Sequence, residues 1–222
     1  HRRAAGVFAP ALTGAAALLV LYLLSRSNYL LFHGIVELFG VVVCFATFVV
    51  AWNTRTWVPS SFLLFLGIAY LFVAAVGIFH TLAYRGMGVF PGFTSNQPTQ
   101  FWILARYIEA FSLLLAPLFL ARRLRPEAAF AALSLVTGFG LLSICRLGFF
   151  PDCYIEGQGL TTFKVASEYV ISAVLLAALR MLYVRRAAFE LRVFRLLAGG
   201  ILAGVAAEMA FTLYTDVYGI AN

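Results

Sequence analysis

Charged side chains are scarce in this chain of 222 residues, of which Asp, Glu, Lys and Arg together make up only 11%. Soluble globular domains carry about 25% charged and about 45–50% apolar residues. Here the hydrophobic share is 63%. This composition excludes an ordinary soluble enzyme and a disordered chain. It also excludes a protein with a single membrane anchor, because the apolar runs continue from one end of the chain to the other.

Lysine and cysteine are also rare. Only Lys164 among the 16 basic residues is a lysine, and the three cysteines are too few and too scattered for a disulfide framework. The net charge of +7 comes from arginines clustered at the ends of apolar runs. That pattern orients membrane proteins and does not form a stripe for phosphates, so we expect no nucleic-acid partner. No P-loop, HExxH or GxSxG motif is present, and the sequence therefore indicates no catalytic activity.

The apolar runs are long enough to cross a bilayer, which takes about 20 residues per helix. They show no alternation of apolar and polar residues, so helices and not strands are expected. Proline and glycine mark the breaks between them. The sequence thus predicts an all-α, polytopic membrane helix bundle, forming one transmembrane domain over residues 1–222. The seven predicted spans are 7–24, 29–52, 60–83, 100–121, 128–150, 161–184 and 194–216.

The basic residues predict the orientation of the bundle. With a cytoplasmic N-terminus, 11 of the 16 basic residues fall in cytoplasmic segments. Seven spans would then leave Asn222 outside, so we expect an eighth span beyond this chain before any cytoplasmic domain. One alternative concerns the first run, because Arg2 and Arg3 precede it as in a signal peptide. No small-x-small cleavage site stands before Ser25, which disfavours that interpretation.

Four charged residues lie well inside the predicted spans: Glu37, Arg106, Glu109 and Glu208. A charge at the bilayer centre costs about 2.5–3.5 kcal/mol, so these groups must be paired, neutralised, hydrated or bound to a ligand. Two hypotheses follow. Either Arg106 holds the bundle together as an internal ion pair, or the four residues form a polar or proton-linked site.

Two histidines are expected at similar depth. His33, Glu37, Gly40 and Cys44 share one face of the second span, because they are spaced four, three and four residues apart. His80 lies near the same end of the third span. Level imidazoles on neighbouring helices could bind a single metal ion, with Glu37 or Cys44 as a further ligand, or clamp haem b between them. The alternative is a hydrogen-bonded packing histidine with nothing bound.

Further candidate residues gather near the outer ends of the spans. Tyr84 follows His80 after one helical turn, and Asp216 lies at the end of the last span. Lys164 and Glu168 are four residues apart and can pair on one helix. Cys153 is the one plausible reactive thiol. The candidate ligand-binding residues are His33, Glu37, His80, Tyr84, Arg106, Glu109, Lys164, Glu168, Glu208 and Asp216.

Several strings together resemble the third type of bacterial membrane-associated sensor domain, over roughly residues 25–222. The strings are Leu31–His33 with Val36–Glu37, Ala51–Asn53, His80–Tyr84 with Gly86–Met87, Thr99–Gln100, Trp102, Ala105–Tyr107, Glu109, Ser112–Leu114, Ala116–Pro117, Phe150–Tyr154, Glu156–Gly157, Gly159–Thr161, Phe163–Lys164, Ser167–Tyr169, Glu208, Phe211–Thr212, Tyr214, Asp216–Gly219 and Asn222. Position 77 departs from the pattern, since it is glycine where an acidic residue is expected.

The resemblance implies an N-terminal input module of a sensor histidine kinase or diguanylate cyclase in the bacterial inner membrane. It further implies a cytoplasmic output domain in cis. We therefore expect a membrane sensor, and a homodimer, that detects a periplasmic, lipid-soluble or redox cue in the outer half of the bundle. The ligand would be a small molecule or redox group, and the lipid bilayer would surround the domain. The rival hypotheses are a small transporter or proton-conducting protein, and a b-type cytochrome with His33 and His80 as haem ligands.

Overall fold

The computed structural model describes residues 2–212, with side chains described from Leu12 onward. Over this part of the chain the fold is helical apart from one short β-hairpin. The all-α prediction is therefore confirmed. The helices are α1 (Arg2–Ser27), α2 (Tyr29–Thr54), α3 (Ser61–Ala83), α4 (Asn96–Leu115), α5 (Pro126–Leu142), α6 (Thr162–Val184) and α7 (Leu191–Phe211). A 3₁₀ turn, η1 (Ala116–Leu120), extends α4, a π-helical turn, η2 (Ser143–Leu147), extends α5, and a second 3₁₀ turn, η3 (Arg186–Ala188), precedes α7.

Local capping fixes where several helices begin. The side chains of Asn28, Ser60 and Thr161 accept hydrogen bonds from the backbone N–H groups three residues later, at 3.0–3.2 Å. These bonds satisfy donors that have no partner within the helix. The predicted starts of the second, third and sixth spans lie within one residue of the observed helices.

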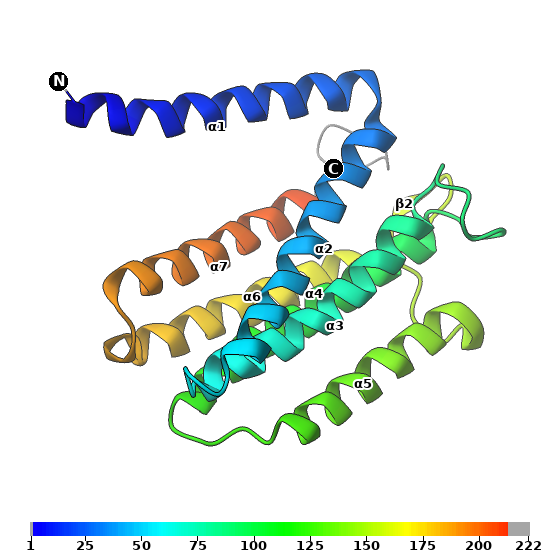
Figure 1. The fold of residues 1–222 in the computed structure, drawn as a ribbon. Helices are drawn as coiled ribbons and strands as arrows, with labels where there is room; N and C mark the ends of the chain where they lie inside the picture. The colour runs from blue at the N-terminus through cyan, green and yellow to red at the C-terminus, as the bar shows by residue number, and fades with distance from the viewer. Residues whose placement is uncertain (1, 213–222) are drawn as a thin grey trace.

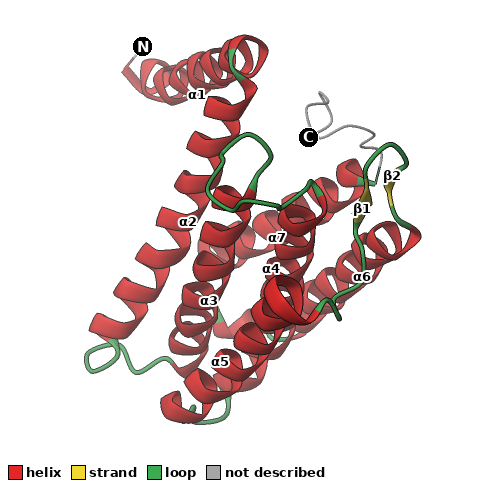
Figure 2. Cartoon of the chain, turned by 90° about the vertical axis from the view of Figure 1, so that its right-hand side faces the viewer, coloured by secondary structure: helices red, strands yellow, loops and turns green. Residues whose placement is uncertain are grey.

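Helices α2 to α7 run alternately up and down between the two ends of the bundle (Figures 1 and 2). Helix α2 packs against α3, α3 against α4, α4 against α6, and α6 against α7. Helix α5 packs against α3 and α4. In the most apolar stretches of α3 and α4, 44% of the residues are buried, against 11% in α2 and α7. Helices α3 and α4 therefore form the centre of the bundle, and α2 and α7 lie at its edges.

The first helix differs from the other six. Helix α1 packs against α2 and stands apart from the other helices (Figure 1). The side chains of α1 are described only from Leu12, so the predicted span 7–24 is covered only in part. The described residues thus contain six helices long and apolar enough to cross a membrane, where the sequence predicted seven spans.

The two ends of the bundle differ in chemistry. One end, here called the loop end, carries the segment 84–95 and the hairpin of β1 (Tyr154–Ile155) and β2 (Gly159–Leu160). The opposite end carries most of the arginines in the connections between helices, and is here called the arginine-rich end. Its arginines are Arg55, Arg122, Arg123, Arg125, Arg185 and Arg186.

Candidate functional site

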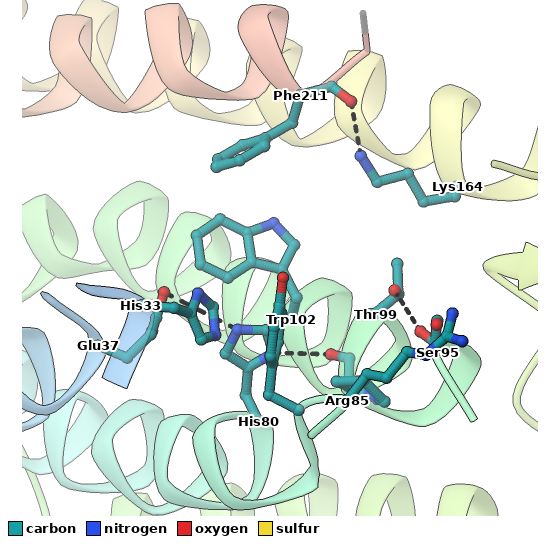
Figure 3. A pocket seen from close by; sticks show the side chains of 11 residues that line it. His33, Glu37, His80, Arg85, Ser95, Thr99, Trp102, Lys164 and Phe211 are labelled. Carbon is teal, nitrogen blue, oxygen red and sulfur yellow. Dashed lines mark hydrogen bonds and ion pairs between the residues drawn. The ribbon is translucent and has the colours of Figure 1, made fainter. Parts of the chain in front are cut away.

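A pocket opens at the loop end, between the helices. The space between its lining residues is about 550 Å³, including the part that is open to solvent. Residues from α2, α3, α4, α6 and the last turn of α7 contribute to it, as Figure 3 shows. The lining residues are His33, Glu37, His80, Tyr84, Arg85, Ser95, Pro98, Thr99, Trp102, Lys164 and Phe211.

Two histidines and one carboxylate meet at the α2 side of this pocket. The ring centroids of His33 and His80 are 5.4 Å apart, and Nε2 of His80 is 3.8 Å from Oε1 of Glu37. One potential ligand atom from each of the three residues lies within 4.8 Å of those of the other two. Nε2 of His33 is buried and has no hydrogen-bond partner among the described residues. The arrangement can hold a metal ion.

The orientation of His80 is set by α4. Its Nδ1 lies 2.8 Å from the main-chain oxygen of Pro98. A carbonyl oxygen only accepts hydrogen bonds, so Nδ1 carries the proton and donates it. In neutral His80 the lone pair is then on Nε2, the atom that faces Glu37. Position 77 is glycine where the resemblance led us to expect an acidic residue. The carboxylate near His80 comes instead from Glu37 of the neighbouring helix α2.

The contact between α2 and α3 bears on the choice between haem and a metal ion. A Cβ atom on Gly77, one turn below His80, would lie 3.1 Å from the side chain of Val41. The ring of Tyr84 also lies against His33, with centroids 3.7 Å apart. A haem plate clamped between the two histidines has no room beside these contacts. The residues present do not fit bis-histidine haem b, and they suit a single ion.

A second cavity, with an empty volume of about 810 Å³, adjoins the first. Glu37, His80 and Trp102 line both. Gly40 and Cys44 also line it. The face of α2 that carries His33, Glu37, Gly40 and Cys44 therefore lines the pocket and the second cavity. A Cβ on Gly40 would meet no atom within 4 Å. A close contact between α2 and α3 is found at Gly67, where a Cβ would lie 2.5 Å from that of Ala51.

The wall of the second cavity contains an ion-pair network. Arg106 of α4 pairs through Nη1 with Glu109, one turn further along, and through Nε with Glu208 of α7. Tyr70 of α3 donates to Oε1 of Glu109 at 3.1 Å. Glu208 is fully buried, and its second oxygen has no hydrogen-bond partner among the described residues. Three helices are thus joined by charges inside the bundle, as the hypothesis of a structural ion pair requires.

A second buried pair connects the pocket to the end of α7. Nζ of Lys164 lies 2.7 Å from Oε1 of Glu168 and donates to the main-chain oxygen of Phe211 at 2.9 Å. The indole of Trp102 lies between His80 and Phe211, with ring centroids 5.5 and 5.0 Å away (Figure 3). Groups at both sides of the pocket are therefore in contact with the last turn of α7.

Comparison with known protein families decides what kind of domain this is. The family model MASE3, described as a membrane-associated sensor domain, matches residues 24–222. The chain belongs to the MASE3 family. The resemblance seen in the sequence is thereby confirmed, and the helical bundle is a membrane sensor input domain and not a catalytic domain. Searches among curated proteins and solved structures found no match to the chain.

The MASE3 domain brings nine of the ten predicted site residues into three neighbouring groups. His33, Glu37, His80 and Tyr84 form the first group. Arg106, Glu109 and Glu208 form the second, and Lys164 and Glu168 form the third. The first and second groups share a cavity, while Lys164 reaches the pocket from the opposite side. Asp216 lies outside the described residues.

The loops that cover the pocket are tied to α4. Ser95 donates from its N–H at 3.1 Å and from its hydroxyl at 2.8 Å to Oε1 of Glu156, and these bonds lower the pKa of Glu156. Oδ1 of Asn96 accepts from the backbone of Cys153 and Tyr154 at 2.8 and 3.1 Å.

Burial raises the pKa of the Cys153 thiol to about 12, so it is not the reactive thiol that the sequence suggested.

Sequence reasoning missed several residues that shape the pocket. Trp102, Phe211 and Ser95 all line the pocket, and none of them is among the predicted site residues. The position of Trp102 three residues after Thr99 on α4 offered one signal, because both then face the same side of the helix. Nothing in the sequence pointed to the main-chain oxygen of Phe211 as a partner of Lys164.

Proposed function

We propose that this MASE3 domain binds a small ligand in the pocket at the loop end and passes the occupancy of that pocket to a cytoplasmic output domain through α7. The observation that carries the proposal is the composition of the pocket wall. Residues of α2, α3, α4 and α6 line it together with Phe211 in the last turn of α7. A ligand that fits one arrangement of these helices better than another would shift the population of the two.

The orientation follows from charge. The arginine-rich end carries the loops between α2 and α3, α4 and α5, and α6 and α7, and positive loops favour the cytoplasm. The loop end, with its pocket, then faces the periplasm or the outer leaflet of a bacterial inner membrane. We take residues 1–222 as one sensory unit that acts as a homodimer, with a kinase or diguanylate cyclase as the output.

The internal ion pairs favour a sensor over a proton conductor. Arg106 is bonded to both Glu109 and Glu208, and Lys164 is bonded to Glu168. Acids held in buried pairs are poor carriers of protons, because each proton uptake leaves a buried arginine or lysine without its counter-charge. The network therefore supports the structural hypothesis for these residues and leaves the pocket as the sensory element.

The first test reads the coding sequence downstream of Asn222. A kinase or cyclase domain after a further span supports the proposal, and a stop codon soon after Asn222 contradicts it.

The second test measures the output activity of the full-length protein. Trp102→Leu removes the ring that lies between His80 and Phe211, and is expected to change the basal output at least about fivefold.

The matched control is Leu135→Met on α5, where the side chain is 74% exposed and lies outside the pocket. This variant should keep the output of the wild-type protein. Equal output from wild type, Trp102→Leu and the control, at equal amounts in the membrane, would contradict the coupling of the pocket to α7.

A further inference from the structure

Glu37 differs from the other carboxylates near the two cavities, because no lysine or arginine pairs with it among the described residues. The basic groups that line the cavities are already paired, namely Arg85 with Glu156, Arg106 with Glu109 and Glu208, and Lys164 with Glu168. The one ion-pair partner that the described part of the chain offers to Glu37 is His80. The side chain of Glu37 is partly buried, at 22% exposure, and the groups beside it that can carry a proton or bind a metal are the imidazoles of His33 and His80.

His33 has the complementary deficiency. The residue is buried, with 7% of its surface exposed, and its Nε2 has no hydrogen-bond partner among the described residues. An unpaired polar atom in such a place costs about 1–3 kcal/mol. His80 directs Nε2 toward the same point, because its Nδ1 is committed to Pro98. Three groups that can bind a cation therefore lie close together, and no lysine or arginine among the described residues pairs with Glu37.

We propose that His33, Glu37 and His80 bind a single divalent transition-metal ion of the Zn²⁺ type. This inference rests on the proposed function and names the ligand class of the same pocket. One ion would satisfy Nε2 of both imidazoles and the carboxylate together. Two imidazoles and one carboxylate with an open further position form a common three-ligand set for zinc.

The distances are compatible with this assignment. Ligands at about 2.0–2.2 Å from a tetrahedral ion lie about 3.4 Å from each other. The 3.8 Å between Nε2 of His80 and Oε1 of Glu37 is close to that value, and the ligand atoms of all three residues lie within 4.8 Å of one another. His33 and Glu37 are four residues apart on α2 and so lie on one face of the helix.

The surroundings resemble those of a metal site. Ligand histidines usually donate their other ring N–H to a carbonyl or carboxylate, as His80 does to Pro98. Glu37 and His80 also line both cavities, so a further coordination position is open to water or a small molecule. Imidazole ligands favour Zn²⁺ or Ni²⁺ over Mg²⁺ and Ca²⁺, which prefer oxygen.

The experiment uses the full-length protein in lipid nanodiscs, stripped of metal with chelator and titrated with ZnCl₂ by calorimetry. We expect one Zn²⁺ per chain, and no binding of MgCl₂ at the same concentration. His33→Gln and Glu37→Gln should each weaken Zn²⁺ binding at least about tenfold. Cys145→Ser serves as the control, because this exposed thiol could bind metal adventitiously and lies outside both cavities.

A spectroscopic measurement on the wild-type protein guards against variants that fail to fold. The X-ray absorption spectrum of the zinc-loaded protein should show two imidazoles and no sulfur ligand. Absence of Zn²⁺ binding, sulfur coordination, or full binding by folded His33→Gln and Glu37→Gln variants would each overturn the metal site.

The output activity separates this inference from the proposed function. If Zn²⁺ does not bind but Trp102→Leu still changes the output, the metal site is wrong and the sensory pocket stands. If Zn²⁺ binds and its addition changes the output of the wild type but not of Glu37→Gln, both are supported. If Zn²⁺ binds and neither Zn²⁺ nor Trp102→Leu alters the output, the metal site stands and the sensory function fails.

Discussion

Lys164 of α6 joins a fully buried carboxylate to the end of α7. Its ammonium lies 2.7 Å from Glu168 and donates to the main-chain oxygen of Phe211 at 2.9 Å. Both charged side chains are almost inaccessible, at 2% and 0% exposure. The buried pair on α6 is therefore joined to the end of α7 by a hydrogen bond from its ammonium group.

Loss of Lys164 alone should be costly. Lys164→Met leaves Glu168 buried without a counter-charge, and breaking such a pair costs about 3–5 kcal/mol. We expect a lower midpoint in a denaturant titration of the protein in detergent. The double variant Lys164→Met with Glu168→Leu removes both charges and should recover most of the loss. A double variant as unstable as the single one would show that packing and not charge is responsible.

Arg106 should be the most sensitive residue of the second network. Arg106→Met leaves Glu109 and Glu208 without their shared cation, at a cost of about 3–5 kcal/mol. The matched variant Glu109→Gln keeps the pair of Arg106 with Glu208 and should be clearly milder. Thermal unfolding of both variants in the same detergent measures the difference. Equal losses would contradict the view that the two carboxylates depend on one arginine.

The contact of α2 with α3 should tolerate no added methyl group at Gly67. A Cβ there would lie 2.5 Å from that of Ala51, and overpacking of this kind costs about 1–3 kcal/mol. Gly138→Ala on α5 is the control, since its Cβ would meet nothing within 4 Å. The melting temperature should fall for Gly67→Ala and stay level or rise for Gly138→Ala. A stable Gly67→Ala variant would mean that the two helices can separate there.

The bond between Glu156 and Ser95 should depend on pH. Hydrogen bonds from Ser95 lower the pKa of Glu156 from its ordinary value of 4.5. A carboxyl whose pKa is lower in the folded state contributes stability above the unfolded value and loses it as the pH falls through the folded one. The amide resonance of Ser95 should therefore titrate with a midpoint below 4.5. A midpoint at or above 4.5, or a shift that persists in Glu156→Gln, would contradict the assignment.

The sequence predicted some parts of the site well and others only as alternatives. The spacing of His33, Glu37, Gly40 and Cys44 predicted one polar face of a helix, and these residues do line the two cavities. The sequence left open whether Arg106 holds the bundle together, because an amino-acid sequence alone does not show which carboxylate an arginine contacts. Its bond to Glu208 joins residues 102 positions apart and exists only after α4 and α7 have packed.

Composition and periodicity by themselves determined that this is a helical membrane protein. Long apolar runs without alternation leave no other way to satisfy the backbone in lipid. Capping residues such as Ser60 and Thr161 determined where helices begin, because these bonds are local. Only the tertiary structure decided the rest: that α1 packs against α2 and stands apart from the other helices, that Glu37 supplies the carboxylate facing His80, and that Lys164 reaches Phe211. Those relationships depend on which faces of distant helices meet, and side-chain packing sets them once the helices are formed.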